Sequence, residues 1–166
     1  MRQRTRLLQS IFGVIGATLL VMSAGCGFHL QGQAPFAEKW RVLELRAVDG
    51  QSDFVRAIRR NLRGAGVDLE AKSPAVLTIE RDELLERVAS VSARNVPREY
   101  ELTYVVRFSL QLGDERVLQA EEVRVSRDFS FDERVALAKD REREQLRAAL
   151  ADEAAVIVLQ RLASLR

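Results

Sequence analysis

The amino-acid sequence predicts a single α+β domain, in the order β-α-β-β-β-α, whose two helices pack on one face of a four-stranded sheet. Residues 100–112 alternate apolar and polar side chains, which is typical of a long strand with one buried face. A Gly113-Asp114 turn joins this segment to a second strand-like segment at 116–128. Two further segments, 53–62 and 146–165, carry apolar residues at helical spacing.

The first two predicted elements are a short strand and a helix. Residues 41–45 alternate well enough for a strand, and Ser52 or Asp53 can cap the helix that follows the next turn. The apolar face of this helix is formed by Phe54, Val55, Ile58 and Leu62. Gly64 and Gly66 are expected to end it, because glycine is common just beyond a helix C-terminus.

The segment after Pro74 leaves two alternatives open. Residues 75–92 are rich in Val, Leu and Ile, but the apolar positions change parity along the segment. This pattern predicts either one long strand with a bulge, or two strands separated by an irregular acidic segment at 81–86. The predicted strand 116–128 shows a similar change of parity.

A long C-terminal helix closes the predicted domain. Asp132 is a plausible cap for it. Its apolar stripe is formed by Leu146, Leu150, Ala154, Ile157, Leu162 and Leu165. The chain has 166 residues in all, which leaves one domain of ordinary size after the N-terminal segment is set aside.

The N-terminal segment has the pattern of a secretory signal peptide. Arg2, Arg4 and Arg6 form a basic region, residues 7–22 are mostly apolar, and residues 23–25 are small. A membrane-spanning helix is the alternative, but such a helix needs about 20 predominantly apolar residues. We therefore expect residues 1–25 to be a signal peptide that is cleaved.

The only cysteine of the chain, Cys26, follows the predicted cleavage point directly. A single thiol in an oxidising compartment is expected either to pair with another chain or to be modified. Residues 23–26 resemble the bacterial lipobox, although Ser23 stands where Leu is usual. The resemblance implies diacylglycerol attachment to Cys26, and Gly27 suggests sorting to the outer membrane. We expect residues 26–39 to form a lipidated tether and residues 40–166 to form the domain.

The charge balance argues against a nucleic-acid partner. The chain carries 26 Lys and Arg against 24 Asp and Glu, and three of the arginines lie in the predicted signal peptide. The remainder is close to neutral, whereas nucleic-acid binding needs a large, clustered positive excess. Any binding of anions must therefore come from local groups of basic side chains.

The sequence offers no set of catalytic or metal-binding residues. His29 is the only histidine, so neither a histidine relay nor a site with several histidine ligands can form. The adjacent acidic pairs at 121–122 and 132–133 show no spacing that suggests coupled acid-base chemistry. We expect no enzyme activity, no metal and no cofactor.

Two basic groups are candidates for binding anions. Arg56, Arg59, Arg60 and Arg63 follow helical spacing and form a stripe that faces either solvent or a binding partner, which would be lipid phosphates or an acidic protein. Arg94 and Arg98 flank the turn at 95–97 between two predicted strands. Arginine presents forked donors that suit phosphate, so these two side chains are the better placed for a phosphorylated ligand.

Several short segments together resemble the family of LPS-assembly lipoproteins, LptE. They are residues 26–30 at the lipid site, 55–62 in the first helix, 94–95 in the turn, 99–100 after it, and 136–140 in the last helix. Their order and spacing match over nearly the whole mature chain. Members of the family often add a polar C-terminal tail, whereas this sequence ends at Arg166 directly after the predicted helix, so only tail-dependent functions are not expected from the resemblance.

The resemblance implies a specific function. The protein would sit in the outer membrane through its lipid anchor, on the periplasmic side. It would plug the β-barrel protein LptD and assist its assembly and the insertion of lipopolysaccharide into the outer leaflet.

The positions matching basic residues that bind lipopolysaccharide in the family are Arg94 and Lys139. Lys139 has a structural alternative, because it can pair with nearby Asp140 or Glu142. The alternative function is a generic lipoprotein that binds a hydrophobic ligand or scaffolds the envelope.

Overall fold

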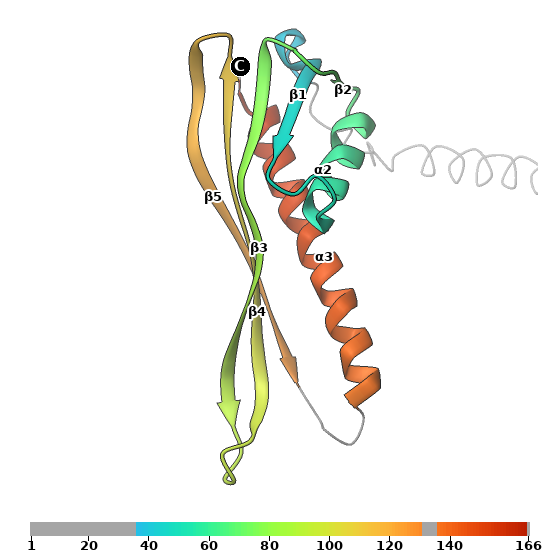
Figure 1. Ribbon diagram of the computed structural model, residues 1–166, viewed down its shortest axis with the longest axis vertical. Coiled ribbons are helices and arrows are strands. Elements are labelled where there is room, and N and C mark those ends of the chain that lie inside the picture. Colours follow the sequence, from blue (N-terminus) through green and yellow to red (C-terminus); the bar gives the residue numbers. More distant parts are fainter. Residues whose placement is uncertain (1–35, 131–135, 166) are drawn as a thin grey trace, which may run out of the picture. The chain divides into compact units, whose positions relative to one another are not determined.

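The structure is a computed structural model that describes residues 36–130 and 136–165. The predicted signal peptide, Cys26 and Asp132 lie outside the described residues. In chain order the elements are η1 (Glu38–Trp40), β1 (Val42–Ala47), α2 (Asp53–Gly64), β2 (Asp68–Leu69), β3 (Ala75–Val91), β4 (Pro97–Leu112), β5 (Glu115–Ser130) and α3 (Ala136–Ala163) (Figure 1).

The strands form one mixed sheet in the order β2-β1-β3-β4-β5. β1 runs parallel to β2 and to β3, whereas β3, β4 and β5 form an antiparallel meander. The α+β class and the two helices are as predicted, but the predicted number of four strands is wrong. The missed strand is β2, whose two residues are too few to show any alternating pattern.

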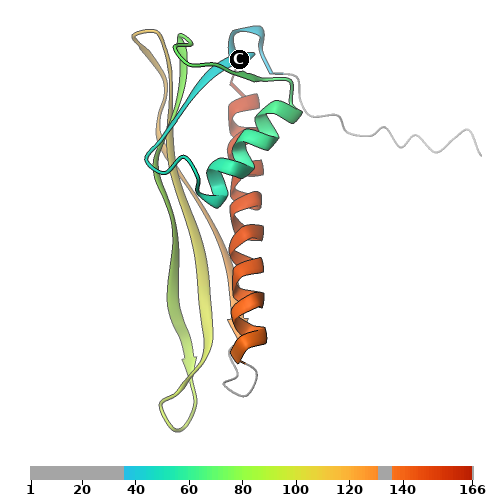
Figure 2. The same cartoon turned by 45° about the vertical axis from the view of Figure 1, so that its right-hand side comes forward.

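Both helices cover one face of the sheet, with α3 lying along β4 and β5 (Figures 1 and 2). The alternation in β4 explains why this face is buried. Leu102, Tyr104, Val106, Phe108 and Leu110 point toward the helices, and each is at most 2% exposed. The predicted buried face of the 100–112 segment is therefore confirmed.

α2 is built as its sequence predicts. The Ser52 hydroxyl caps the helix by accepting a hydrogen bond from the Val55 backbone N–H at 3.1 Å. All four residues of the predicted apolar face are fully buried, and Ala57 joins them. Gly66 follows the helix with φ +77°, a conformation that glycine adopts without strain.

β3 is one continuous strand, so the first of the two alternatives for this segment is confirmed. Its pairing with β4 shifts register between Ile79 and Arg81, and again near Ser90. The parity change in β5 has the same cause, because the partners of Phe108 and Leu110 are Glu121 and Leu118. A bulge adds one residue to a strand, so the apolar positions change parity in the sequence although the apolar side chains stay on the same face of the sheet.

The apolar stripe of α3 agrees with the predicted one only in part, since Leu146 is only partly buried and Leu165 lies beyond the end of the helix. Leu150, Ala154 and Leu162 are buried, but Ile157 is 37% exposed and Val158 takes its place in the core. The buried residues lie at 150, 154, 158 and 162, a four-residue step, and at the adjacent positions 151, 155 and 159. A three-residue step from Ala154 points Ile157 toward the side of the helix, where the core no longer covers it.

The core extends to the start of the described chain. Phe36 is 7% and Trp40 1% exposed, and the Trp40 indole N–H donates to the backbone oxygen of Leu165 at 3.2 Å. The first and last described segments are thereby joined. The predicted domain boundary at residue 40 falls within this packed segment, since Phe36 already belongs to the core.

Candidate functional site

Arg94 lies on the turn that joins β3 to β4. The turn is closed by backbone hydrogen bonds from Ser92 N–H to Val96 O at 2.8 Å and from Asn95 N–H to Ser92 O at 2.9 Å. The Ser92 hydroxyl also accepts from the Val96 N–H at 3.2 Å. Asn95 has φ +63°, a left-handed conformation that asparagine tolerates better than most residues. The local sequence thus holds the turn in one shape.

Arg94 and Arg98 present their charges to the surroundings. Both are exposed, and neither forms an ion pair with any residue of the parts of the chain that the structure describes. An unpaired guanidinium keeps all of its donors available for a phosphate or carboxylate. The turn is therefore suited to bind an anion without breaking an existing contact.

Lys139 is in a different environment. Its Nζ lies 2.8 Å from Glu142 Oε2 and 3.4 Å from the Ser130 hydroxyl, and 5.3 Å from the centre of the Phe129 ring. Only 18% of its side chain is exposed. These contacts tie the first turns of α3 to the end of β5, so the structural alternative for Lys139 has direct support.

The two predicted residues are carried by elements at the same end of the fold. The β3–β4 turn and the start of α3 both lie away from α2, β1 and β2 (Figures 1 and 2). Arg94 is thus placed on an exposed turn, and Lys139 on the first turns of the helix that packs against the sheet.

Two arginines of the stripe on α2 form ion pairs within the protein. Arg56 pairs with Asp53 in the same helix and also donates to the Gln51 backbone oxygen. Arg60 reaches Asp152 of α3, with 2.6 Å between nitrogen and oxygen. The stripe therefore helps to join α2 to α3, which leaves Arg59 and Arg63 outside the ion pairs found among the described residues.

The sheet face away from the helices carries a network of ion pairs, most of them between strands, here called the charged sheet face. Its members are Glu80, Arg81, Arg87, Glu101, Arg107, Glu122 and Arg124. Representative distances are 2.8 Å for Arg87–Glu101 and 3.3 Å for Arg107–Glu80. Arg81 and Arg107 face each other across β3 and β4, but each also pairs with a glutamate, so this broad surface is polar and nearly neutral.

A polar cluster joins α2 to the middle of the sheet. The hydroxyls of Tyr104 and Ser52 both donate to the Asp82 carboxylate, the former at 2.6 Å. Burial of Tyr104, together with this hydrogen bond to Asp82, raises the pKa of the phenol well above its usual value. Sequence reasoning missed this cluster, because its residues lie far apart in the sequence: Ser52 precedes α2, Asp82 is in β3 and Tyr104 is in β4.

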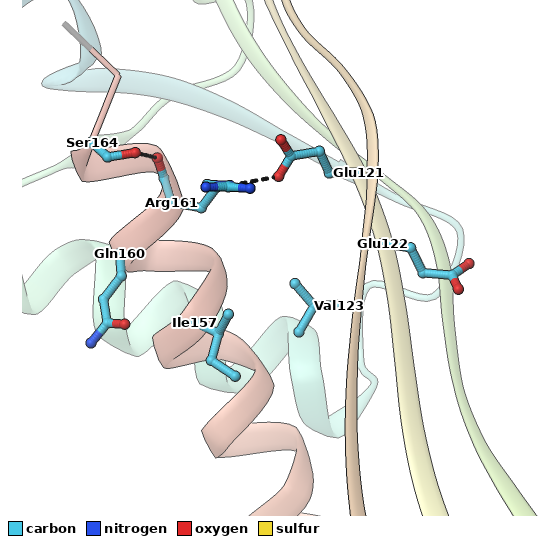
Figure 3. Close-up of a pocket in the computed structure, with 7 residues that line it drawn as sticks. All are labelled: Glu121, Glu122, Val123, Ile157, Gln160, Arg161 and Ser164. Atoms are coloured by element: carbon cyan, nitrogen blue, oxygen red, sulfur yellow. Dashed lines mark hydrogen bonds and ion pairs between the residues drawn. The ribbon is translucent and has the colours of Figure 1, made fainter.

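An open cleft of about 320 Å³ lies between β5 and the last turns of α3 (Figure 3). Val123 and Ile157 line its inner part, and an ion pair of 2.8 Å between Arg161 and Glu121 crosses it. Sequence analysis did not find this cleft. The sequence could have indicated the cleft only through Ile157, an apolar residue of α3 that stays exposed. That exposure becomes evident only once the buried positions of α3 are known.

The described residues contain no group of three or more His, Cys, Asp or Glu side chains that could hold a metal ion. Among the same residues, none of the helices is both long and apolar enough to cross a membrane. The described surfaces offer exposed arginine donors, paired charges and exposed apolar side chains.

The family model for lipopolysaccharide assembly, LptE, matches residues 40–162. The chain is 29% identical over 164 residues to the LPS-assembly lipoprotein LptE of Yersinia enterocolitica, covering 96% of this chain and 76% of that protein. It is also 29% identical over 163 residues to the LPS-assembly lipoprotein LptE of Photorhabdus laumondii, with coverages of 96% and 86%.

Solved structures agree with these relatives. The crystal structure of the rare lipoprotein B from Shewanella oneidensis superposes with a TM-score of 0.67 at 32% identity, covering 74% of this chain and 94% of that one. The solution structure of lipoprotein B from Nitrosomonas europaea gives a TM-score of 0.67 at 25% identity, with coverages of 83% and 91%. From the match to the family model, supported by these relatives, we conclude that the chain belongs to the LptE family of lipopolysaccharide-assembly lipoproteins.

Proposed function

We propose that this protein binds and plugs the LptD β-barrel, and that it assists both the assembly of the barrel and the insertion of lipopolysaccharide into the outer leaflet. Membership of the LptE family, through the match over residues 40–162, is the observation that carries the proposal. The role is one of binding and assembly, without a catalytic step.

The charged sheet face supports the plug. The interior of a large transmembrane barrel is polar, so a domain that enters it needs a polar surface with few unpaired charges. Arg87 pairs with Glu101 across β3 and β4, and Arg124 pairs with Glu122 on β5. Such a surface can exchange water for polar groups of a barrel wall without leaving isolated charges buried.

The exposed turn supports lipopolysaccharide binding. Lipid A carries phosphates, and Arg94 offers forked donors that no other described residue occupies. Lys139 is the second proposed contact, and it reaches a phosphate by exchanging its present partner, Glu142. The exchange replaces one charge-assisted bond by another, so we expect Lys139 to add less affinity than Arg94.

The N-terminal part of the proposal concerns the anchor. A signal peptide of residues 1–25 is removed, Cys26 receives the lipid, and residues 26–39 tether the domain to the periplasmic side of the outer membrane. Two or three acyl chains, worth about 0.8 kcal/mol per buried CH₂, hold a protein on a membrane stably. An intact mass for the mature protein without added acyl chains would contradict this part.

The test of the proposed function is a double charge reversal. Arg94→Asp with Lys139→Asp should greatly weaken lipopolysaccharide binding, because each attraction to phosphate becomes a repulsion. Co-purification with the barrel should persist, since a broad surface holds the plug. Binding of lipopolysaccharide by the unmutated protein should also fall as the salt concentration rises.

The matched control is Arg116→Asp. Arg116 is an exposed arginine beside the β4–β5 turn, at the opposite end of the long strands, and it forms no ion pair with the described residues. It should leave lipopolysaccharide binding unchanged. A double variant that binds lipopolysaccharide like the parent would refute the site, and an unmutated protein that does not co-purify with the barrel would refute the function.

A further inference from the structure

β5 forms one edge of the sheet along its whole length. The strand order is β2-β1-β3-β4-β5, so the 16 residues of β5 have β4 on one side and no other described strand on the opposite side. Such an edge presents a row of unpaired backbone N–H and C=O groups, which can bind a further strand. The other edge strand, β2, has only 2 residues, so β5 is the edge that can form a long pairing.

The cleft between β5 and α3 is bounded by this edge strand. Figure 3 shows Glu121 and Val123 pointing toward α3, while Glu122, between them, points to the other side of the sheet. Ile157 of α3 is 37% exposed and lines the cleft together with Val123. A strand added at the β5 edge would therefore satisfy backbone groups and also bring side chains to an uncovered apolar surface.

The charges of β5 make the strand complementary to a second copy of itself. In an antiparallel pair centred on one residue, positions at equal distances before and after the centre face each other. With Val123 at the centre, Glu122 faces Arg124 of the copy, and Arg124 faces Glu122 of the copy. In this register no like charges face each other anywhere between residues 116 and 130.

The two neighbouring registers are opposed by charge. Centring the pair one residue earlier places Glu122 opposite Glu122 of the copy, and centring it one residue later places Arg124 opposite Arg124 of the copy. Like charges directly opposite each other in a sheet are destabilising. Charged side chains commonly prevent edge strands from pairing, but on β5 they leave the register centred on Val123 open.

The same register brings the two α3 helices together. α3 packs over β4 and β5, so pairing two β5 edges places both helices on the same face of one continuous sheet. With neighbouring strands about 4.8 Å apart, the two helix axes come within roughly 10 Å of each other, the distance at which helices pack. Ile157 lines the same cleft as Val123, so the Ile157 side chains of both copies lie close to the twofold axis.

We propose that two copies of this protein associate through an antiparallel pairing of their β5 edges centred on Val123, with Ile157 of each copy packed against the other. A twofold interface of this kind uses the same surface on both copies. A second copy is favoured over an unrelated strand, because β5 itself supplies the opposite charge at the two central charged positions. The inference does not depend on the proposed function, since it rests on the strand edge, its charges and the cleft.

A cysteine at the centre of the register tests the pairing directly. The chain has one cysteine, Cys26, so Val123→Cys adds a single thiol to β5. Opposite Cα atoms in an antiparallel pair lie about 4.5–5.5 Å apart, which a disulfide can span. Under mild oxidation in mild detergent, the full-length variant should form a covalent dimer, whereas the parent should not.

The matched control is Val117→Cys. Val117 lies on the same strand and, like Val123, is partly buried against the core. In the proposed register the two copies of residue 117 are about 40 Å apart, because each lies several residues from the centre in opposite directions. This variant should therefore stay uncrosslinked under the conditions that crosslink Val123→Cys.

A charge exchange tests the register independently of any thiol. Sedimentation equilibrium of the full-length protein in mild detergent measures the dissociation constant of the dimer. Glu122→Arg or Arg124→Glu alone should raise this constant about tenfold, because like charges then face each other in two places. The double exchange should restore association, since each pair again joins opposite charges.

The helix contact has its own variant and control. Ile157→Glu should weaken the dimer about tenfold or more, because it places two carboxylates near the twofold axis. Leu137→Glu is the control, since Leu137 is 71% exposed in the first turn of α3, far along the helix from Ile157. It should leave the dissociation constant unchanged. Thermal melts of all variants check that each remains folded.

Other results would overturn the inference. The dimer is refuted if the parent stays monomeric at every concentration that can be reached, if both cysteine variants crosslink equally, or if the double charge exchange associates as weakly as the single ones. If Val123→Cys crosslinks only to the barrel in a co-purified complex, the β5 edge belongs to the barrel contact and the proposed function stands without the dimer. If the protein dimerises but does not co-purify with the barrel, the proposed function fails and the dimer stands.

Discussion

The two ends of the long sheet differ in what their side chains do. At the end that carries α2, residues such as Phe54, Ile58 and Leu77 are fully buried between helices and sheet. At the other end, the hairpin of β3 and β4 projects past the helices, and Val88, Val91 and Val96 are exposed. The same two strands, β3 and β4, run through both environments.

This difference shows how the fold can keep an exposed turn ordered although the turn lies outside the hydrophobic core. The buried end supplies the hydrophobic stabilisation, and the continuous pairing of β3 with β4 carries that order out to the turn. Residues at the hairpin end are then free to serve binding, because the core does not depend on them. Substitutions at the two ends should accordingly affect different measurements.

The largest expected effect lies in the buried end of β4. Phe108→Ala should lower the free energy of unfolding by about 3–5 kcal/mol, because Phe108 is fully buried and its removal leaves a cavity. Denaturant melts of the full-length protein measure this change. Its neighbour Arg107 points to the charged sheet face and pairs with Glu80 at 3.3 Å.

Arg107→Ala is therefore the matched control, with an expected cost of about 0.5 kcal/mol, as for other exposed ion pairs. The two residues are adjacent on β4 and lie on opposite faces of the sheet. Similar losses from both substitutions would show that the face assignment of β4 is wrong.

An intermediate effect is expected where α2 meets the middle of the sheet. Tyr104→Phe removes the hydrogen bond of 2.6 Å to Asp82 and should cost about 2 kcal/mol, since the acceptor is a carboxylate. Thr103→Val is the control from the opposite face, where the Thr103 hydroxyl bonds to Ser126 at the surface. That substitution should cost less.

The same tyrosine predicts a pH dependence. Burial and the neighbouring Asp82 raise the pKa of Tyr104 above the value of about 10 that it has in the unfolded chain. The folded state therefore keeps its proton while the unfolded state loses it, so stability falls as pH rises above about 10. The fall should be smaller in Tyr104→Phe, and equal falls in parent and variant would contradict the assigned environment.

At the buried end, the long periodic elements could be predicted from the sequence better than the short strand β2 and the exact packing of α3. Alternation from Tyr100 to Leu112 and the helical spacing around Ile58 follow from local periodicity, so both elements and their buried faces were predicted correctly. β2 was missed because two residues carry no period. Ile157 was wrongly assigned to the core because, counted from Ala154, a three-residue step to Ile157 and a four-residue step to Val158 both fit helical spacing. Only the packing of α3 shows that Val158 is the buried residue.

The candidate site was predictable only in part. Composition pointed to Arg94 and Arg98 because a turn between two predicted strands places its side chains at the surface. The engagement of Lys139 with Phe129 and Ser130 could not be predicted, since it depends on how the start of α3 meets the end of β5. The charged sheet face likewise requires the register of β3 and β5 against β4, which bulges displace.

The smallest expected effect on stability separates the two proposed lipopolysaccharide contacts. Lys139→Ala should lower the free energy of unfolding by about 1 kcal/mol, because it breaks the ion pair with Glu142 and the contact of the largely covered Lys139 side chain with Phe129. Arg94→Ala should change it by less than about 0.5 kcal/mol, because Arg94 is exposed and unpaired among the described residues. Denaturant melts of both variants, run beside lipid A binding, test this difference. Arg94→Ala should nevertheless lose more lipid A affinity than Lys139→Ala. If Arg94→Ala destabilises the fold as much as Lys139→Ala does, the hairpin tip contributes to the fold and is not a surface free for binding.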